Sequence, residues 1–358
     1  MEERVTARRF VSGLSLLAVV PLVAVAVFSC ARDADRSDRS VRIAIGGQSQ
    51  LIYLPTTLAR ELGYYRDEAL DVELQDLPGG SKALEALVGG SADVVSGFYD
   101  HTIQMAADGR ELVAFVTMLR FPGLVLVTSP QSAGSVTRIE DLKGRIAGVT
   151  TAGSSSHMLL TYLLQRHGLA ADSVSVTAIG TAATAIAAIE HDKVAAGMMA
   201  DPAATVVSRR NPGVRVLADL RHADGVKDAF GSATYPASVL YAKGEWLRAH
   251  RATATKLARA ITRTLAWIQT HPPREIAGRM PRSFRGDDEA IYVDALTSSM
   301  AMFSPDARLT PEGAEAVRTL LAASMDKVRN RSIDLSKTYT NEFVLAGERG
   351  EAMPEGRQ

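Results

Sequence analysis

From Val41 onward, short β-branched runs alternate with helical segments, and this alternation restricts the fold more than any other feature of the chain. It is typical of βαβ units, which build a mainly parallel sheet covered by helices. We therefore expect an α/β fold. Strands are predicted at residues 41–46, 71–77, 92–96, 112–118, 124–128, 145–150, 174–179, 194–199, 214–220 and 237–241.

A segment that begins at Gly79 is similar to a later one that begins at Thr181. In both, a turn of small residues opens a helix with one apolar face, and a short strand follows. Chance similarity between two βαβ units would explain this, and so would two lobes of the same architecture. For two lobes, the chain is expected to cross between them near residues 119–126 and 233–239, which makes the first lobe discontinuous.

The pattern becomes helical after residue 243. Leu257, Ile261, Leu265 and Ile268 recur at helical spacing and predict one long amphipathic helix over residues 245–270. Further helices are expected at residues 287–302 and 311–328. An N-cap is predicted at Asp201, with Pro202 as the first helical residue of another helix.

Length and charge exclude several classes of protein. A chain of 358 residues is long enough for about two domains. Apolar residues make up 46%, and 40 Lys plus Arg balance 40 Asp plus Glu, so most of the chain is expected to fold and no broad basic surface is available for nucleic acid. We expect a monomer that binds no nucleic acid.

The first 30 residues have the pattern of an export signal. Arg4, Arg8 and Arg9 precede an uncharged apolar run over residues 10–29, and Cys30 follows in a context similar to a bacterial lipoprotein processing box. We expect lipidation at Cys30; an uncleaved membrane anchor and a plain signal peptide with an incidental cysteine are the alternatives. Residues 31–40 are predicted to be a flexible tether. Each interpretation places the remainder of the chain outside the cytoplasm.

Candidate binding residues lie in the loops that follow the predicted strands, because ligands of open α/β sheets bind at the carboxyl ends of strands. Loops in the first half of the chain contribute polar and aromatic groups, with a solvated turn, a helix cap and a core position as the structural alternatives. They are Gln48, Ser49, Ser81, Tyr99 and His101, with Phe98 adding apolar surface.

The second half of the chain contains the densest group, a turn in which hydroxyls and backbone N–H groups converge at the start of a helix. Such a turn binds a sulfonate, carboxylate or phosphate without any arginine; a serine-rich capped turn is the alternative. Its members are Thr151, Ser154, Ser155, Ser156 and His157. Asp201 would add a carboxylate for an amine or another donor, unless it only caps its helix. Tyr235 is a weaker candidate.

The sequence gives no support for an enzyme. None of the 7 histidines has metal-ligand spacing, and no nucleophile elbow or phosphate-binding glycine loop is present. Cys30 is the only cysteine, so a disulfide or a cysteine-based metal site within the chain is excluded. We predict no catalytic residue, no metal and no cofactor.

Residues 53–65, 70–74, 79–81, 86–94, 141–149, 153–157, 168–169 and 200–202 resemble the nitrate/sulfonate/taurine-type (SsuA/THI5-like) substrate-binding proteins of ABC importers. The resemblance extends from about residue 41 to 270. It implies a type II periplasmic-binding-protein fold, in which two Rossmann-like lobes close on a ligand about a two-strand hinge.

On this basis lobe 1 is expected to comprise residues 41–122 and 238–358, and lobe 2 residues 123–237. The expected ligand is a small organic anion or zwitterion such as a sulfonate, taurine, nitrate or an aromatic acid, bound between the lobes and delivered to permease and ATPase subunits. A thiamine-pyrimidine precursor as ligand and a ligand-sensing lipoprotein that partners a membrane receptor remain alternatives.

Overall fold

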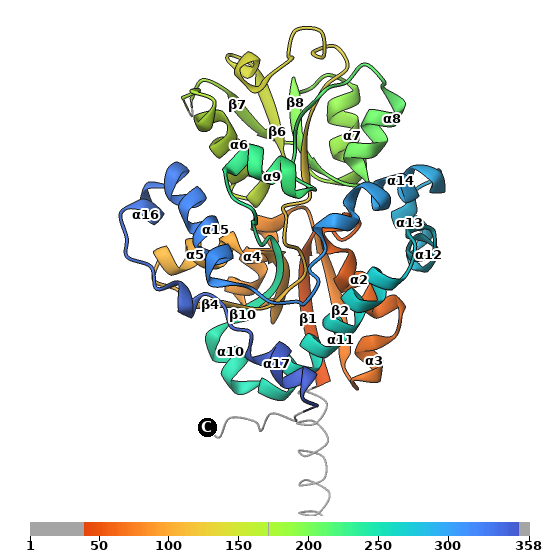
Figure 1. The fold of residues 1–358 in the computed structure, drawn as a ribbon, viewed down its shortest axis with the longest axis vertical. Coiled ribbons are helices and arrows are strands. Elements are labelled where there is room, and N and C mark those ends of the chain that lie inside the picture. Colours follow the sequence, from red (N-terminus) through yellow and green to blue (C-terminus); the bar gives the residue numbers. More distant parts are fainter. Residues whose placement is uncertain (1–38, 171, 351–358) are drawn as a thin grey trace, which may run out of the picture.

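Two lobes lie one above the other in the computed structural model, which describes residues 39–170 and 172–350 (Figure 1). The sheet of lobe 1 has the strand order β2 (Asp71–Leu77), β1 (Ser40–Gly46), β3 (Val94–Phe98), β10 (Ser238–Lys243) and β4 (Leu112–Thr117). The sheet of lobe 2 has the order β7 (Ser175–Ala178), β6 (Ile146–Val149), β8 (Ala196–Ala200), β5 (Leu124–Thr128) and β9 (Val216–Asp219). Each predicted strand is present, with ends that differ by at most two residues. The predictions for Cys30 and the export signal, and for most of the tether, lie outside the described residues.

The two sheets share one topology. In lobe 1, β1 runs parallel to β2 and β3, and β10 runs antiparallel to both β3 and β4. In lobe 2, β6 runs parallel to β7 and β8, and β5 runs antiparallel to both β8 and β9. The similar segments found in the sequence form α4 (Gly80–Gly89) and α7 (Ala182–Glu190), which follow corresponding strands. This correspondence supports the two-lobe explanation of their similarity.

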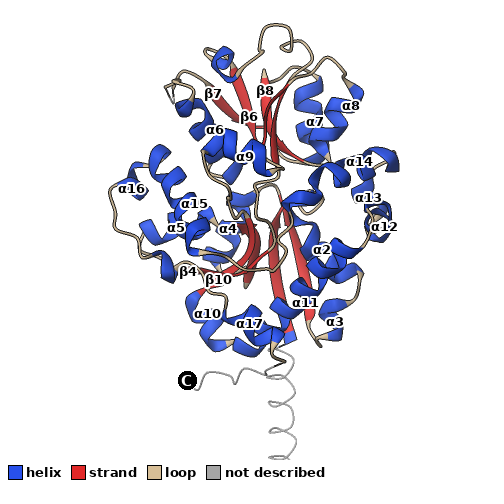
Figure 2. Ribbon diagram, viewed as in Figure 1, coloured by secondary structure: helices blue, strands red, loops and turns tan. Residues whose placement is uncertain are grey.

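Helices cover both faces of each sheet, which buries the apolar runs of the central strands (Figure 2). Lobe 1 contains η1 (Leu51–Tyr53), α2 (Leu54–Glu61), α3 (Tyr64–Asp67), α4 and α5 (Asp100–Ala107). Lobe 2 contains η2 (Ile139–Leu142), α6 (Ser155–Arg166), α7, α8 (Ala203–Arg210) and α9 (Ala223–Phe230).

The chain crosses between the lobes in two segments that lie side by side. The first joins β4 to β5 and the second joins α9 to β10. The backbone N–H of Tyr235 donates to the carbonyl of Arg120 at 3.1 Å, and the N–H of Ala237 donates to the carbonyl of Leu119 at 2.9 Å. These bonds tie the two segments into a short hinge ribbon.

The chain after β10 is helical, as expected, but the single helix over residues 245–270 is wrong. Two helices are present, α10 (Gly244–Ala249) and α11 (Arg251–Thr270), because His250 at φ −116° and ψ 44° leaves the helical conformation. The apolar positions that predicted the helix all lie in α11, so the pattern did not support the first turns.

The other C-terminal helices also break sooner than predicted. They are α12 (Pro273–Arg279), α13 (Arg282–Arg285), α14 (Glu289–Ser299), η3 (Met300–Met302), α15 (Pro311–Ser324), α16 (Asp326–Arg329), η4 (Leu335–Lys337) and α17 (Glu342–Glu348). Although these helices follow the last strand of lobe 1, α14 packs against α8 and α15 packs against α6. The C-terminal segment therefore contacts lobe 2 on both sides of the hinge (Figure 1).

Candidate functional site

A narrow cavity of about 20 Å³ lies between the lobes. It is situated at the carboxyl ends of the parallel strands, where an open α/β sheet binds its ligand. Lobe 1 supplies aromatic and apolar side chains with one amide, and lobe 2 supplies hydroxyl groups together with Leu124 of β5. The lining residues are Gly46, Gln50, Ile52, Tyr53, Gly80, Phe98, Leu124, Thr150, Ser154, Ser155 and Ser156. None of these carries a formal charge.

Three of the predicted site residues, Ser154, Ser155 and Ser156, line this cavity together. They lie where β6 ends and α6 begins, and the hydroxyls are held by short bonds. Ser154 donates its proton to the carbonyl of Thr151 at 2.7 Å, and the Ser156 hydroxyl accepts from the backbone N–H of Thr150 at 3.0 Å. The turn is a fixed polar surface, in agreement with the predicted density of hydroxyls.

Two helices direct their N-termini at the cavity from opposite lobes. Ser155 begins α6 in lobe 2, and Gly80 begins α4 in lobe 1. The first N–H groups of a helix have no acceptor within it and carry partial positive charge, which favours an anion. Gly46 must be a glycine here, because a Cβ at this position would lie 2.4 Å from the backbone nitrogen of Gly80.

Direct hydrogen bonds join the lobes around the cavity. The hydroxyls of Ser81 in lobe 1 and Thr151 in lobe 2 lie 2.9 Å apart. The backbone N–H of Leu51 donates to the carbonyl of Asp201 at 2.8 Å. Ser155 donates its hydroxyl proton to Oδ1 of Asp100 at 2.9 Å. The structure is thus a closed form, in which groups of both lobes complete the site.

Asp100 lies beside the cavity, bonded to the lining residue Ser155, and was not among the predicted site residues. The sequence offered one signal, an acidic residue directly after a buried strand, but a helix cap explains that signal equally well. Its carboxyl group is fully buried. It accepts a hydrogen bond from the hydroxyl of Ser155 in lobe 2 and, at 3.5 Å, one from the hydroxyl of Tyr235 in the second crossing. Burial raises the pKa of Asp100 to about 7, although both hydroxyl partners act in the opposite direction.

His101 lies directly behind the cavity rather than in its lining. Its ring is fully buried, and Nδ1 lies 3.2 Å from the hydroxyl of Tyr241. Burial lowers the pKa of His101 to about 4, so the imidazole is neutral at physiological pH. The role of this side chain in the closed form is to pack and to anchor Tyr241.

Other predicted site residues lie outside the cavity lining. The amide of Gln48 donates to Thr57 at 3.2 Å within lobe 1, and neighbouring Ser49 does not line the cavity. The hydroxyl of Tyr99 lies 2.6 Å from that of Thr338, on the C-terminal segment. His157 accepts the backbone N–H of Gly153 at 3.1 Å through Nδ1 and belongs to the turn itself.

The carboxylate of Asp201 is occupied by protein groups. One oxygen accepts from the backbone and hydroxyl of Thr205, and the other accepts from Arg221 at 2.8 Å and from Ser299 at 2.9 Å. The predicted capping position is wrong by one residue, because Pro202 occupies the N-cap and α8 begins at Ala203. Asp201 still stabilises this helix, since its side chain reaches the N–H of Thr205 in the first turn.

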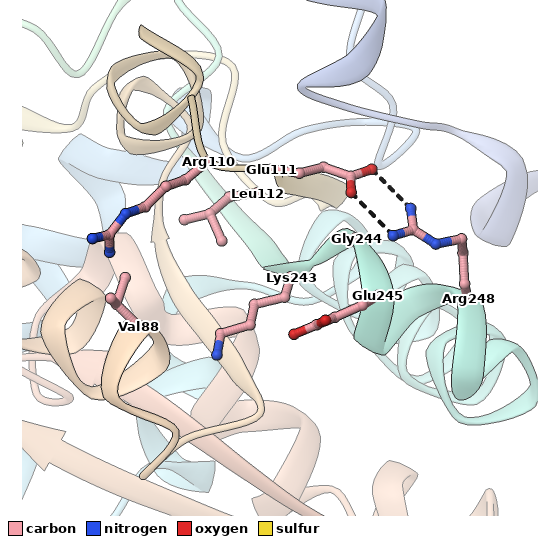
Figure 3. Close-up of a pocket in the computed structure, with 8 residues that line it drawn as sticks. All are labelled: Val88, Arg110, Glu111, Leu112, Lys243, Gly244, Glu245 and Arg248. Atoms are coloured by element: carbon pink, nitrogen blue, oxygen red, sulfur yellow. Dashed lines mark hydrogen bonds and ion pairs between the residues drawn. The ribbon is translucent and has the colours of Figure 1, made fainter. Parts of the chain in front are cut away.

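A second cavity, of about 310 Å³, lies at the opposite end of the lobe 1 sheet, where β10 ends and β4 begins (Figure 3). The ion pair between Glu111 and Arg248 closes one side of it, and Arg110 and Lys243 flank Val88 on the other side. The cavity is built from lobe 1 alone and contains none of the predicted site residues.

Within residues 39–170 and 172–350, no cluster of three or more histidine, cysteine, aspartate or glutamate side chains is arranged to bind a metal ion. Over the same part of the chain, no helix combines the length and apolar character needed to cross a membrane.

Comparison with known proteins agrees with this architecture. The family model described as NMT1/THI5-like matches residues 52–275. A solved structure from Bordetella bronchiseptica RB50 has 36% sequence identity and a TM-score of 0.84, with 87% of this chain and 98% of that chain covered.

Two more distant structures share the fold. The periplasmic aliphatic sulphonate binding protein SsuA from Escherichia coli has 21% identity and a TM-score of 0.64, over 89% of this chain and 95% of that one. The periplasmic nitrate-binding protein NrtA from Synechocystis PCC 6803 has 12% identity and a TM-score of 0.69, over 88% and 90%. These relatives are named as binding proteins.

Proposed function

The chain belongs to the NMT1/THI5-like family of substrate-binding proteins, and from this membership and the interlobe cavity we propose that it is the extracytoplasmic solute-binding component of an ABC importer. It binds its ligand without chemical change, as a substrate-binding protein rather than an enzyme. Closure of the two lobes around a small solute presents the closed form to a membrane permease. The bound ligand stabilises this form because it contacts groups of both lobes at once.

The observation that carries this proposal is the composition of the cavity. Its lining comes from both lobes, and the N-termini of α4 and α6 approach it from opposite sides. A ligand held there would lose its contacts with one of the lobes whenever the lobes separate. This dependence on closure is what a capture-and-release protein requires.

We propose that the ligand is small and carries an anionic group. Unpaired N–H groups at two helix N-termini favour such a group, and no arginine or lysine is needed to bind it. Phe98, Tyr53 and Ile52 provide apolar surface for an organic portion of the ligand. The nitrate and sulphonate of the named relatives are examples of this charge class.

The proposed site of action is the outer face of the cell membrane or the periplasm. Cys30 would be the point of lipid attachment after removal of the preceding residues. Mass spectrometry of the exported protein tests this, since lipidation predicts an acylated N-terminal cysteine. A Cys30→Ala variant should appear in the soluble fraction; its retention in the membrane would contradict lipid anchoring.

A thermal-shift screen tests the proposed function. The full chain in mild detergent is screened against sulfonates, nitrate, carboxylates, amino acids and pyrimidines. A ligand at 1,000 times its Kd adds about 4 kcal/mol to the free energy of unfolding, which raises Tm by several degrees. An unchanged Tm across all the acids would contradict the proposal.

Variants then locate the binding site. Ser155→Ala combined with Ser156→Ala should weaken binding of any hit, since both serines line the cavity. His271→Ala should leave the affinity unchanged, because its ring stacks on Trp267 at 3.9 Å at the end of α11. Equal affinities for the two variants would exclude the interlobe cavity as the site.

A further inference from the structure

The neighbours of the cavity hydroxyls determine to which group each hydroxyl donates its proton. Thr150 donates its hydroxyl proton to Ser154 at 2.9 Å, and Ser154 donates to the carbonyl of Thr151. Ser156 lies 3.0 Å from the hydroxyl oxygen of Thr150 and 2.9 Å from that of Ser154, whose protons are already committed. With those two protons used, Ser156 is left to donate to one of these oxygens. The three hydroxyls are thus bonded to one another and to the backbone.

Ser155 completes this set in a different way. Its hydroxyl proton is donated across the lobe interface to the buried carboxyl group of Asp100 at 2.9 Å. A serine hydroxyl has one proton and two lone pairs, so the proton of Ser155 is used and its lone pairs remain. Because Ser155 lines the cavity, these lone pairs are available to a ligand.

Gln50 on the lobe 1 side has the same polarity. Its amide nitrogen donates to the carbonyl of Gly46 at 2.8 Å and to that of Gly47 at 3.3 Å. The amide oxygen of Gln50 is then left as an acceptor. Among the polar side chains that line the cavity, the hydroxyl of Tyr53 is the one whose proton is not donated to another group of the described residues.

The cavity thus contains two kinds of surface. The backbone N–H groups at the starts of α4 and α6 are donors and favour an acidic group. The side-chain oxygens of Ser155 and Gln50 are acceptors and would repel the same acidic group. A ligand whose only polar group is an acidic one pairs with the backbone N–H donors. It leaves the acceptor oxygens of Ser155 and Gln50 without a donor, which is costly in a buried site.

We propose that Asp100 is a positioning residue which, by taking the proton of Ser155, makes the cavity select acids that also carry an N–H donor, such as an amine or a ring N–H. This inference rests on the proposed function and specifies its ligand class. When it is ionised, above its pKa of about 7, Asp100 also makes Ser155 a stronger acceptor, because a hydroxyl that donates to an anion is polarised. Asp100 acts through Ser155 and does not line the cavity itself.

Matched pairs of acids test the proposal by calorimetric titration of the full chain in mild detergent at pH 8, where Asp100 is ionised. The pairs differ by one amino group: taurine with ethanesulfonate, β-alanine with propionate, and 2-aminobenzoate with benzoate. In at least one pair, the wild-type protein should bind the amino acid about tenfold or more tightly than its partner, as expected for one hydrogen bond to a polarised group. The measured quantity is this affinity ratio.

Variants separate positioning from a structural effect. Ser155→Ala keeps the backbone N–H but removes the acceptor, so the ratio should fall toward one, and Ser155→Thr should restore it. Asp100→Asn should also lower the ratio because the charge behind Ser155 is lost. Ser208→Ala is the control, since that hydroxyl donates to the carbonyl of Ala204 within α8. Its ratio should equal that of the wild type.

The outcomes are distinct. Equal binding of both members of every pair, or preference for the member without the amino group, would overturn the proposal while leaving the proposed function intact. A Ser155→Ala variant that weakens both members equally would also overturn it, because a structural defect lowers both affinities. If Ser155→Ala does not fold, Asp100→Asn carries the test. If no acid binds, the proposed function fails and this inference fails with it.

Discussion

Ser155 of lobe 2 donates its hydroxyl proton to Asp100 of lobe 1 at 2.9 Å, and this bond joins the lobes directly beside the interlobe cavity. The carboxyl group that accepts it is fully buried. A buried acid is costly when ionised, so the closed form binds a proton more readily than the unfolded chain. The stability of the closed form should therefore depend on pH.

Replacement of Asp100 by Asn should remove this dependence. The carboxyl group has a higher pKa when folded than when unfolded, so the wild type loses stability as pH rises from about 4 through about 7. The rise in pKa from 3.8 to about 7 corresponds to about 4 kcal/mol.

Chemical denaturation at pH 5 and pH 8 measures the effect of Asp100→Asn. The variant should gain stability over the wild type between these values, whereas Asp326→Asn, at an exposed helix end, should not. A constant difference between Asp100→Asn and the wild type across the range would refute the assignment.

His101 should produce the opposite dependence at acid pH. Burial lowers its pKa from 6.5 to about 4, so the unfolded chain takes up a proton first as pH falls. The wild type should lose about 3 kcal/mol between pH 7 and pH 4 through this group. His101→Phe should lose less over this range than the wild type.

The control for His101→Phe is His191→Gln, an exposed histidine of lobe 2. Denaturation curves at several pH values give the comparison. If His101→Phe and the wild type lose stability in parallel, His101 is not the group responsible.

Gly79 should control closure of the lobes. Its backbone is extended, with φ 174° and ψ 172°, so an alanine fits lobe 1 by itself. In the closed form, however, a Cβ at Gly79 would lie 2.5 Å from Oγ1 and 2.7 Å from Cγ2 of Thr151 in lobe 2. Gly79→Ala should therefore hold the lobes apart and weaken ligand binding by about tenfold or more, the equivalent of about 1.4 kcal/mol.

Small-angle scattering should show a larger radius of gyration for Gly79→Ala with ligand present. Thr151→Ala removes both atoms that clash, so the double variant should regain closure. Gly89→Ala, where a Cβ meets no atom within 4 Å, should behave as the wild type. A Gly79→Ala protein that closes normally would show that this contact does not limit closure.

Arg221 should contribute far more to stability than the arginine of a nearby surface pair. It donates to the carboxylate of Asp201 at 2.8 Å, and that carboxylate is 1% exposed. Arg221→Met leaves a buried charge without its cation, which typically costs about 3 to 5 kcal/mol. Denaturant titration should show a loss near the lower value, since Thr205 and Ser299 still donate to Asp201.

Arg209 provides the surface comparison, because its ion pair with Asp294, which joins lobe 2 to the C-terminal segment, is exposed. Arg209→Met should cost less than about 1 kcal/mol. Similar losses for Arg209→Met and Arg221→Met would contradict the argument from burial.

The strands were predictable because β-branched runs bounded by turn residues report on local burial. The break at His250 was not, since four apolar positions within α11 carry no information on the residues before them. Apolar residues at helical spacing predict a buried helix face only over the residues that they span.

The candidate site was predictable only in part, for a related reason. Ser154, Ser155 and Ser156 lie in one turn, so their convergence follows from local sequence. The direction of Tyr99 depends on Thr338 and Tyr339, and the role of Asp100 depends on Ser155 of the other lobe. These partners are distant in sequence, and no local pattern identifies them.

The position of β10 bears on how the chain reaches its native state. This strand lies in the interior of the lobe 1 sheet, between β3 and β4, yet all of lobe 2 precedes it in the sequence. During synthesis β3 and β4 cannot acquire their shared neighbour until residues 238–243 have been made, whereas every strand of lobe 2 is by then available. Lobe 2 is thus able to assemble first, while the first half of lobe 1 waits with unpaired strand edges. A chaperone that delays folding before export would have to shield these strand edges for longer than any other part of the two sheets.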